Sequence, residues 1–284
     1  MNTNNTHDVE PMTMENMPQD VSNVPNALLS IQQPTLFHSE LVASDVNPDA
    51  VASHWSLNTK QRITYNMIIT QVINPDCELL SMIITGTART GKSHIIHAAH
   101  DFLARRNESY QFCLCLFTGI AAQNIDGITL HSALSLSVFR GHTLLSKTCE
   151  NLVKMWANVD FLFVDEYSMI GCRLTYKIHL ALTIAKESSK PFGGINIIFA
   201  SDFCQLPAVG DSRLYTKFSN GHDATHDQNL NAVYGCPLWL SIHNVIVLQT
   251  VERQTGSGAS VLIELLSRLR EGKCTNADND FLST

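Results

Sequence analysis

From residue 56 onward the chain alternates between amphipathic stretches and short apolar runs. Residues 56–73 and 92–106 carry apolar residues at helical spacing, and further helices are expected near 173–187 and 260–270. The apolar runs have the length of strands and fall at residues 81–86, 112–117, 159–166, 195–201 and 244–250. Apolar strands that alternate with amphipathic helices are typical of a parallel sheet covered on both faces. The pattern therefore predicts one doubly wound α/β domain.

The first two helices show the apolar spacing most clearly. In residues 56–73 we expect Asn58 or Thr59 to be the N-cap, and the apolar positions are Ile63, Met67, Ile68 and Val72. In residues 92–106 the corresponding positions are Ile95, Ile96, Ala99, Phe102 and Leu103. These positions predict the faces that the two helices turn toward the sheet.

The first 55 residues differ in composition from the rest of the chain. Residues 1–50 contain five of the nine prolines and many Asn, Thr and Ser residues. Such a segment cannot bury enough apolar surface to become ordered. We therefore expect a disordered acidic leader over residues 1–55 and the folded domain over residues 56–275.

The net charge of −7 at pH 7 is concentrated in this leader. Residues 1–59 hold seven of the 26 acidic residues and none of the 19 Lys and Arg residues, so the rest of the 284-residue chain is neutral. A neutral body offers no electrostatic argument for binding to nucleic acid.

Cysteine usage and hydropathy indicate the compartment. The eight cysteines form no C-x-x-C pair, which is typical of reduced thiols in an intracellular protein. The sequence has no apolar run long enough to cross a bilayer and no charged-then-apolar signal pattern at its N-terminus. We expect a soluble intracellular protein with no membrane partner.

The segment GTARTGKS at residues 86–93 matches the phosphate-binding pattern G-x-x-x-x-G-K-S. It stands between a predicted strand and a predicted helix, where backbone N–H groups can surround phosphate oxygens at the helix N-terminus. Lys92 would reach the β and γ phosphates of ATP, and the Ser93 hydroxyl would ligate Mg²⁺. The predicted ATP-binding residues of the loop are Gly86, Thr87, Ala88, Arg89, Thr90, Gly91, Lys92 and Ser93.

A pair of acids supports this interpretation. Asp165 and Glu166 end the apolar run FLFVDE, where two adjacent carboxylates are costly unless they meet a cation or water. Asp165 suits the magnesium shell, and Glu166 suits polarising an attacking water molecule. The alternative is a strand-end turn whose acids are only solvated. Together with the loop, the acids predict hydrolysis of a nucleoside triphosphate.

Arg89 is the unusual residue of the loop. If its position requires a positive φ, a side chain there costs about 1 kcal/mol or more. A guanidinium at this position could also contact phosphate. We therefore expect nucleotide binding to survive, with turnover left open.

Several further segments occur in a recognisable order: LNTKQ (57–61), TGIAAQNIDGITLHS (118–132), DEYSM (165–169), FGGINIIFASDFCQLPAV (192–209), LQTVERQTG (248–256) and LLSRLREGK (265–273). With the phosphate loop, they resemble the motifs of the Pif/RecD group of superfamily 1 DNA helicases, especially the Pif-type enzymes of helitron transposons. The resemblance covers residues 56–272 and implies a P-loop NTPase with a RecA-like sheet. Three positions depart from the family pattern: Arg89 and Ser201 replace glycines, and Ala208 replaces a proline.

The resemblance also implies roles for individual residues. Gln61 would face the adenine, Gln205 would sense the γ-phosphate, and Arg253 would approach the same phosphate. For Arg253 the alternative is a surface ion pair with Glu252. The residues that match a DNA-contacting segment are Thr118, Gly119, Thr129 and His131, although His131 alone would be read as a helix-cap or core histidine.

The function implied by the resemblance is that of a DNA helicase. Such an enzyme hydrolyses ATP with Mg²⁺ and acts on single-stranded or forked DNA in DNA repair, recombination and telomere maintenance. A nuclear location is expected from the DNA substrate alone. The sequence contains no feature that identifies a protein partner. Two alternatives stay open: a catalytically weak nucleotide- or DNA-binding remnant of a helitron gene, and an unrelated P-loop kinase or ATPase for a small molecule.

A Pif-type motor also needs two RecA-like lobes that clasp ATP. Each lobe would require about 150 residues or more, so the ordered part of this chain accommodates one. We expect residues 276–284 to begin the link to a second lobe, and we do not expect these 284 residues to unwind DNA alone.

Overall fold

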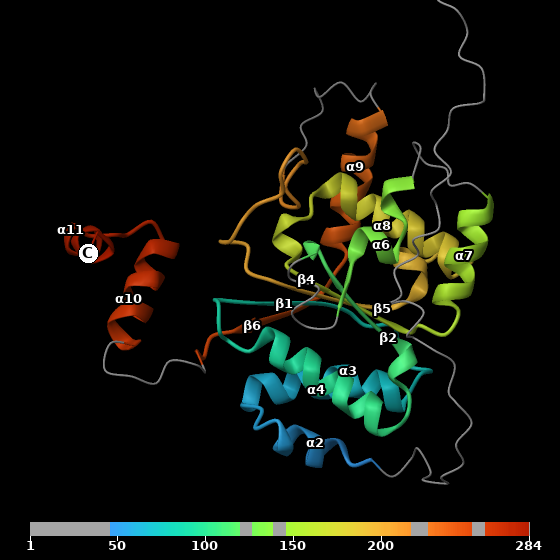
Figure 1. The fold of residues 1–284 in the computed structure, drawn as a ribbon, viewed down its shortest axis with the longest axis horizontal. Coiled ribbons are helices and arrows are strands. Elements are labelled where there is room, and N and C mark those ends of the chain that lie inside the picture. The colour runs from blue at the N-terminus through green and yellow to red at the C-terminus, as the bar shows by residue number, and fades with distance from the viewer. Residues whose placement is uncertain (1–45, 120–126, 139–145, 217–226, 252–258, 284) are drawn as a thin grey trace, which may run out of the picture.

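The computed structural model describes residues 46–119, 127–138, 146–216, 227–251 and 259–283. Within these ranges six parallel strands form one sheet in the order β3-β2-β4-β5-β1-β6 (Figure 1). The strands are β1 (Ser81–Gly86), β2 (Phe112–Leu116), β3 (Ile128–Thr129), β4 (Phe161–Asp165), β5 (Asn196–Ser201) and β6 (Asn244–Leu248). The order places β1 between β5 and β6 and confirms the predicted parallel α/β architecture.

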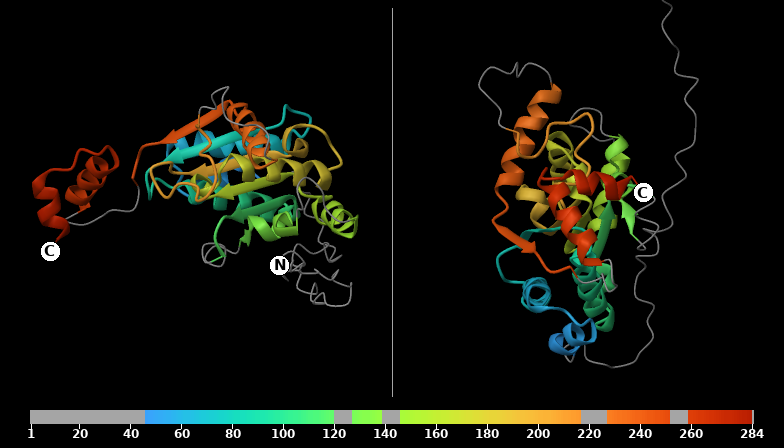
Figure 2. Two further views of the ribbon diagram at one scale, coloured as in Figure 1. Left: turned by 90° about the horizontal axis from the view of Figure 1, so that it is seen from above. Right: turned by 90° about the vertical axis from the view of Figure 1, so that its left-hand side faces the viewer.

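Helices cover both faces of this sheet, with α2, α3 and α4 on one side and α6, α7, α8 and α9 on the other (Figures 1 and 2). The α-helices are α2 (Pro48–His54), α3 (Thr59–Ile73), α4 (Lys92–Arg105), α6 (Leu130–Ala133), α7 (Ser146–Trp156), α8 (Cys172–Ala185), α9 (Asp227–Leu240), α10 (Ala259–Arg270) and α11 (Asn276–Leu282). Short 3-10 helices are η2 (Ser109–Gln111), η3 (Leu136–Val138), η4 (Tyr167–Met169) and η5 (Pro191–Gly194). None of the helices in these ranges is long and apolar enough to cross a bilayer.

The core consists of two hydrophobic clusters, one on each face of the sheet. All six residues of β5 are buried, and successive side chains point to opposite faces. Ile197 and Phe199 therefore join the cluster under α7, α8 and α9, whereas Ile198 and Ala200 join the cluster under α2, α3 and α4. This arrangement explains why the strands are continuous apolar runs in the sequence.

The folded unit begins earlier than the sequence predicts. Helix α2 lies inside the predicted leader, where Asn47 caps its first turn by accepting a hydrogen bond from Asp49 N (2.9 Å). Val51 and Ala52 are buried in the cluster that α3 and α4 share. The predicted boundary at residue 55 is therefore wrong for this stretch, because a polar composition concealed one short helix with an apolar side.

The apolar face of α3 was also only partly predicted. Asn58 is the N-cap as expected, and Ile68 is buried, but Ile63 is 52% exposed. The buried side chains include Tyr65 and Ile69, because α3 packs between α2 and α4 as well as over the sheet. Tertiary neighbours, and not the apolar period alone, therefore set the buried face.

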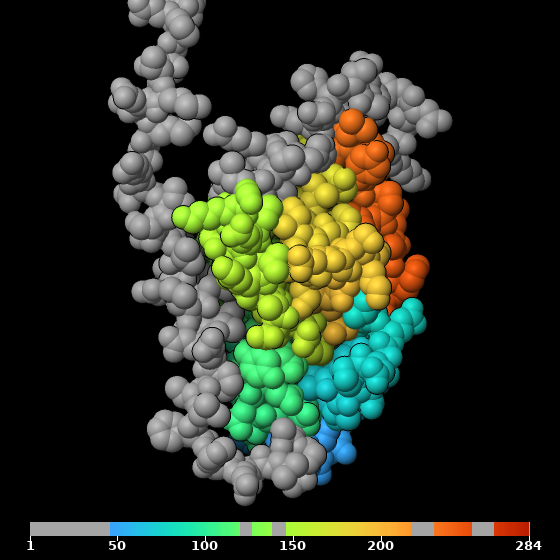
Figure 3. All heavy atoms as spheres, turned by 90° about the vertical axis from the view of Figure 1, so that its right-hand side faces the viewer, coloured from blue at the N-terminus to red at the C-terminus, as the bar shows by residue number. Residues whose placement is uncertain are grey.

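The helices on the other face include two that the sequence did not predict, α7 and α9. Figure 3 shows α7 (yellow-green) lying beside α8 (yellow). Helix α9 contains Pro237, which normally disfavours a helix interior. It packs closely on α8 at Gly235, where a Cβ atom would collide with Cys172 O.

Candidate nucleotide-binding site

The phosphate loop connects β1 to α4 as the sequence predicts. Gly91 has φ 85° and stands at the N-cap of α4, and Arg89 has φ 66°. Lys92 Nζ donates hydrogen bonds to Gly86 O (2.9 Å) and Thr87 O (3.1 Å). The lysine therefore spans its own loop, and its ammonium lies among the backbone groups that would surround a phosphate.

Arg89 has the positive φ that the sequence left open for this position. A left-handed conformation costs an L-residue about 1–2 kcal/mol, which glycine avoids. Arg89 and Ala88 are exposed at the outside of the loop. The loop therefore has, at Arg89, a backbone conformation that favours glycine, and this position is strained because arginine occupies it.

Gln61 joins helix α3 to the phosphate loop. Its side chain, 1% exposed, accepts a hydrogen bond from Asn58 N (3.0 Å) and donates one to Thr90 O (3.1 Å). Asn58 Oδ1 in turn accepts a hydrogen bond from Gln61 N (3.0 Å), which completes a capping box. A Cβ atom on Gly91 would collide with Gln61 Nε2. Gln61 thus fixes the loop at the start of α4, a structural role that the sequence did not suggest.

The acidic pair meets the loop at the carboxyl end of β4. Ser93 Oγ donates to Asp165 Oδ2 at 3.1 Å, and Glu166 N donates to Asp165 Oδ1 at 2.8 Å. Glu166 has φ 58°, a strained conformation for a residue with a side chain. The structure therefore brings together the two predicted magnesium ligands and sets Glu166 next to them.

Burial and neighbouring charges shift the pKa values of Glu166 and Lys92. Burial raises the pKa of Glu166, the Asp165 carboxylate raises it further, and a hydrogen bond from Thr118 Oγ1 (3.4 Å) lowers it. Burial lowers the pKa of Lys92, which the carboxylates of Asp202 and Asp165 oppose. An acidic and a basic side chain with shifted pKa values at the same edge of a sheet are typical of a functional site.

The candidate DNA-contacting residues lie at the same edge of the sheet. Thr118 and Gly119 follow β2, and Thr129 pairs in register with Leu116 at the end of β3. Thr129 caps α6, in which His131 is exposed and packs edge-on against Phe117 (5.9 Å between ring centroids). Because Thr118 bonds to Glu166, this group of residues adjoins the acidic pair.

Ser201 and Gln205 lie at the carboxyl end of β5, Ser201 as the last residue of the strand and Gln205 in the turn that follows it. Gln205 is exposed, and its backbone N donates to Asp202 O (2.9 Å) in a turn. Ser201, which replaces a family glycine, is buried, and its Oγ accepts a hydrogen bond from Ser168 N (2.8 Å). The serine therefore joins the end of β5 to the turn after the acidic pair. Arg253 lies outside the described residues.

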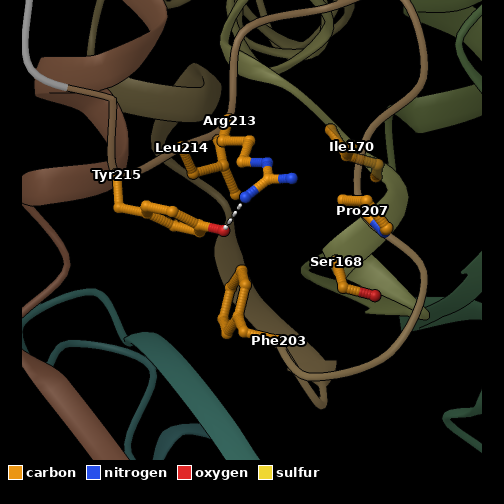
Figure 4. Close-up of a pocket in the computed structure, with 7 residues that line it drawn as sticks. All are labelled: Ser168, Ile170, Phe203, Pro207, Arg213, Leu214 and Tyr215. Atoms are coloured by element: carbon orange, nitrogen blue, oxygen red, sulfur yellow. Dashed lines mark hydrogen bonds between the residues drawn. The ribbon is translucent and has the colours of Figure 1, made fainter. Parts of the chain in front are cut away.

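A small open pocket lies next to the segment after β5 (Figure 4). Arg213 Nη1 donates to the Tyr215 hydroxyl at 3.2 Å, and the Phe203 ring meets Tyr215 edge-on. The residues that line the pocket are Ser168, Ile170, Phe203, Pro207, Arg213, Leu214 and Tyr215. No sequence pattern predicts this pocket, because its residues come from separate segments.

Two charged residues near Lys92 were not predicted as site residues. Asp202 follows the buried strand β5 just as Asp165 ends β4, so a strand-end acid was a signal that could have identified it. Arg270 pairs with Asp202 from helix α10, more than 60 residues later in the chain. No local pattern marks that arginine.

The sequence is similar to a known family and to known proteins. The sequence model described as PIF1-like helicase matches residues 56–280. The ATP-dependent DNA helicase PIF1 of Saccharomyces cerevisiae is 32% identical over 193 residues, which are 66% of this chain and 21% of that protein. The Xenopus laevis protein of the same name is 28% identical over 226 residues, 78% of this chain and 31% of that protein. This chain thus spans well under half the length of these relatives.

Solved structures show the same fold. The Pif1 helicase from Candida albicans superposes with a TM-score of 0.57 at 24% identity, over 78% of this chain and 46% of that chain. Bacteroides Pif1 bound to ssDNA gives a TM-score of 0.54 at 23% identity, over 80% of this chain and 49% of that chain.

Proposed function

The chain belongs to the PIF1-like helicase family, and from this premise we propose that its folded part is an ATP-hydrolysing motor domain of a DNA helicase. The observation that carries the proposal is the contact between the phosphate loop and the acidic strand end, in which Ser93 Oγ and Asp165 Oδ2 are 3.1 Å apart. Phosphoryl transfer depends mainly on positioning and electrostatic stabilisation, which this arrangement of one lysine, one hydroxyl and two carboxylates can supply.

The side chains at the contact fit Mg²⁺. Ser93 and Asp165 offer a hydroxyl and a carboxylate oxygen, and Mg²⁺ is commonly held by one or two carboxylates plus the phosphates of its substrate. Among the described residues no group of three or more His, Cys, Asp or Glu side chains forms a metal site by itself. When bound, Mg²⁺ would neutralise charge on the β and γ phosphates.

The protein's own residues have separable tasks in this proposal. Lys92 would exchange its two loop carbonyls for phosphate oxygens, and Glu166, whose pKa is raised, would hold and polarise the attacking water. Gln205 would sense the γ-phosphate from the turn after β5. Arg253 would neutralise the charge that develops during transfer. Gln61 would contact the adenine through the amide hydrogen and the oxygen lone pair that its bonds to Asn58 and Thr90 do not use.

We propose single-stranded or forked DNA as the second substrate. The support is the neighbourhood of Thr118, Gly119, Thr129 and His131 to the acidic pair, together with the ssDNA complex of Bacteroides Pif1. Because Thr118 Oγ1 donates to Glu166, a strand that binds there could alter the position or the pKa of the general base. A genomic DNA substrate would place the protein inside the cell and in the nucleus.

We do not assign DNA strand separation to the described residues alone. The yeast relative is matched over 21% of its length, and separation requires lobes that move against each other. Roles in DNA repair, recombination and telomere maintenance are proposed for the same larger unit. For the described residues, the reaction that can be tested directly is ATP hydrolysis.

The test is ATP hydrolysis by purified protein with and without single-stranded DNA. We expect magnesium-dependent hydrolysis that DNA stimulates, and we expect Lys92→Ala to abolish it by weakening the grip on the β and γ phosphates. Well-folded protein that binds ATP but shows no stimulation by DNA would favour the alternative of a nucleotide-binding remnant. That alternative is motivated by the strain at Arg89.

A further inference from the structure

Helices α10 and α11 lie beyond the end of the sheet at which β1 leads into the phosphate loop (Figures 1 and 2). The two helices hold each other through Arg268, whose guanidinium donates to Asp278 at 2.9 and 2.6 Å. Of their described side chains, none belongs to either hydrophobic cluster of the sheet and its covering helices. The described side chains of this helix pair therefore share no apolar core with the sheet.

A partly buried ion pair connects the helix pair to the sheet. Arg270, the last residue of α10, pairs through Nη1 with Oδ2 of Asp202. The Asp202 side chain is 5% exposed, and its Oδ1 accepts the backbone N–H of Cys204 at 3.1 Å. A carboxylate this deeply buried is costly without a cation. Arg270 supplies that cation from helix α10.

The ion pair adjoins the phosphate loop. Strands β1 and β5 are neighbours with Thr85 opposite Ser201, so Gly86 and Asp202 leave adjacent strands side by side. The charges of Asp202 and Arg270 both act on the pKa of Lys92, Asp202 raising it and Arg270 lowering it, although burial has the largest effect. Arg270 is thus within electrostatic reach of the lysine that would bind phosphate.

We propose, on the basis of the function proposed above, that Arg270 is a nucleotide-sensing residue with two alternative anionic partners. In the nucleotide-free protein the partner is the Asp202 carboxylate, and in the bound state it is the terminal phosphate of a nucleoside triphosphate. The exchange would couple the position of α10 and α11 to the occupancy of the site.

The physical basis is competition between anions for one guanidinium. Phosphate and carboxylate both match the planar fork of arginine, and charge-assisted bonds of this kind are about twice as strong as neutral ones. A triphosphate brings several negative charges to the edge where Asp202 stands, whereas Asp202 offers one. Because no described side chain of the helix pair belongs to the apolar clusters of the sheet, a change of partner meets little opposition from packing there.

Calorimetry with the β,γ-imido analogue of ATP and Mg²⁺ tests the exchange on the full chain. Arg270→Ala should weaken binding roughly tenfold, the effect of losing one charge-assisted bond. The matched control is Arg268→Ala, which removes the same charge two residues earlier on α10 and should change binding by no more than about twofold. Arg270→Lys, which keeps the charge but loses the fork, should lie between the two, and circular dichroism verifies folding of each variant.

The partner residue gives a signature that a purely structural ion pair would not show. Asp202→Asn removes the competing anion, so it should tighten binding of the analogue in the parent protein. The tightening should shrink in the Arg270→Ala background, because the residue that mediates it is absent. Hydrogen exchange of α10 should respond to the analogue in the parent protein and not in Arg270→Ala.

Two results would overturn the inference while leaving the proposed function intact. One is equal binding by Arg270→Ala and Arg268→Ala, and the other is weaker binding by Asp202→Asn in both backgrounds. Failure of the proposed function would be visible earlier, as absence of heat from the unsubstituted protein.

Discussion

Replacing Gln61 by alanine tests whether its side chain fixes the phosphate loop. The substitution removes two hydrogen bonds of a side chain that is 1% exposed, one from Asn58 N (3.0 Å) and one to Thr90 O (3.1 Å). It leaves the glycine conformation at Gly91 and the sequence of the loop unchanged. The loop would keep its residues but lose its connection to α3.

The expected loss follows from those two bonds. Each buried hydrogen bond contributes about 1 kcal/mol net, so Gln61→Ala should lower the free energy of unfolding by about 2 kcal/mol. For a domain of this size, such a loss lowers the midpoint of thermal unfolding by about 4–8 °C. Gln61→Glu is the matched variant, since it keeps the acceptor for Asn58 N but places a carboxylate against the Thr90 carbonyl. It should lose the loop contact and retain the helix cap.

Urea titration followed by circular dichroism measures the stability change, and calorimetry compares ATP with inorganic tripolyphosphate. A residue that fixes the loop should weaken the binding of both ligands when it is removed. A residue that only contacts adenine should weaken the binding of ATP alone and leave stability unchanged. Unaltered stability in Gln61→Ala would therefore refute the reasoning from the two hydrogen bonds.

Three other substitutions probe the strain and the charges of the site. Arg89→Gly should be more stable than Arg89→Ala by about 1 kcal/mol in urea titrations, because both lack the guanidinium and only alanine keeps the left-handed strain; equal stabilities would contradict the positive φ. Ser201→Ala should destabilise the protein by about 1–3 kcal/mol in the same assay, since the buried N–H of Ser168 loses its acceptor; no change would show that another group replaces it. Thr118→Val removes a hydrogen bond that lowers the raised pKa of Glu166. If Glu166 is the general base proposed above, it acts only when deprotonated, so the acid limb of the pH profile for ATP hydrolysis should move to higher pH; an unmoved limb would exclude Glu166 as the titrating group.

The sequence by itself determined the central part of the sheet and the phosphate loop. Strand β1 and helix α4 lie where the pattern placed them, because a continuous apolar run and an apolar helical period leave few alternatives. The spacing of Gly86, Gly91 and Lys92 specified a loop between those two elements. The position of Asp165 at the end of an apolar run indicated the carboxylate that meets Ser93 of the loop. These are local signals, which a chain retains whatever packs around it.

The tertiary structure alone decided which distant residues complete the site. Gln61 reaches the loop across 29 positions of sequence, and Arg270 reaches Asp202 across 68. Helix α2 and the buried face of α3 were likewise settled by neighbouring helices, because α2 has few apolar residues and those of α3 are spread around the helix instead of lying on one side. The physical reason is the parallel sheet: it gathers the carboxyl ends of strands that are far apart in sequence at one edge, and no periodicity within a single segment records which side chains meet there.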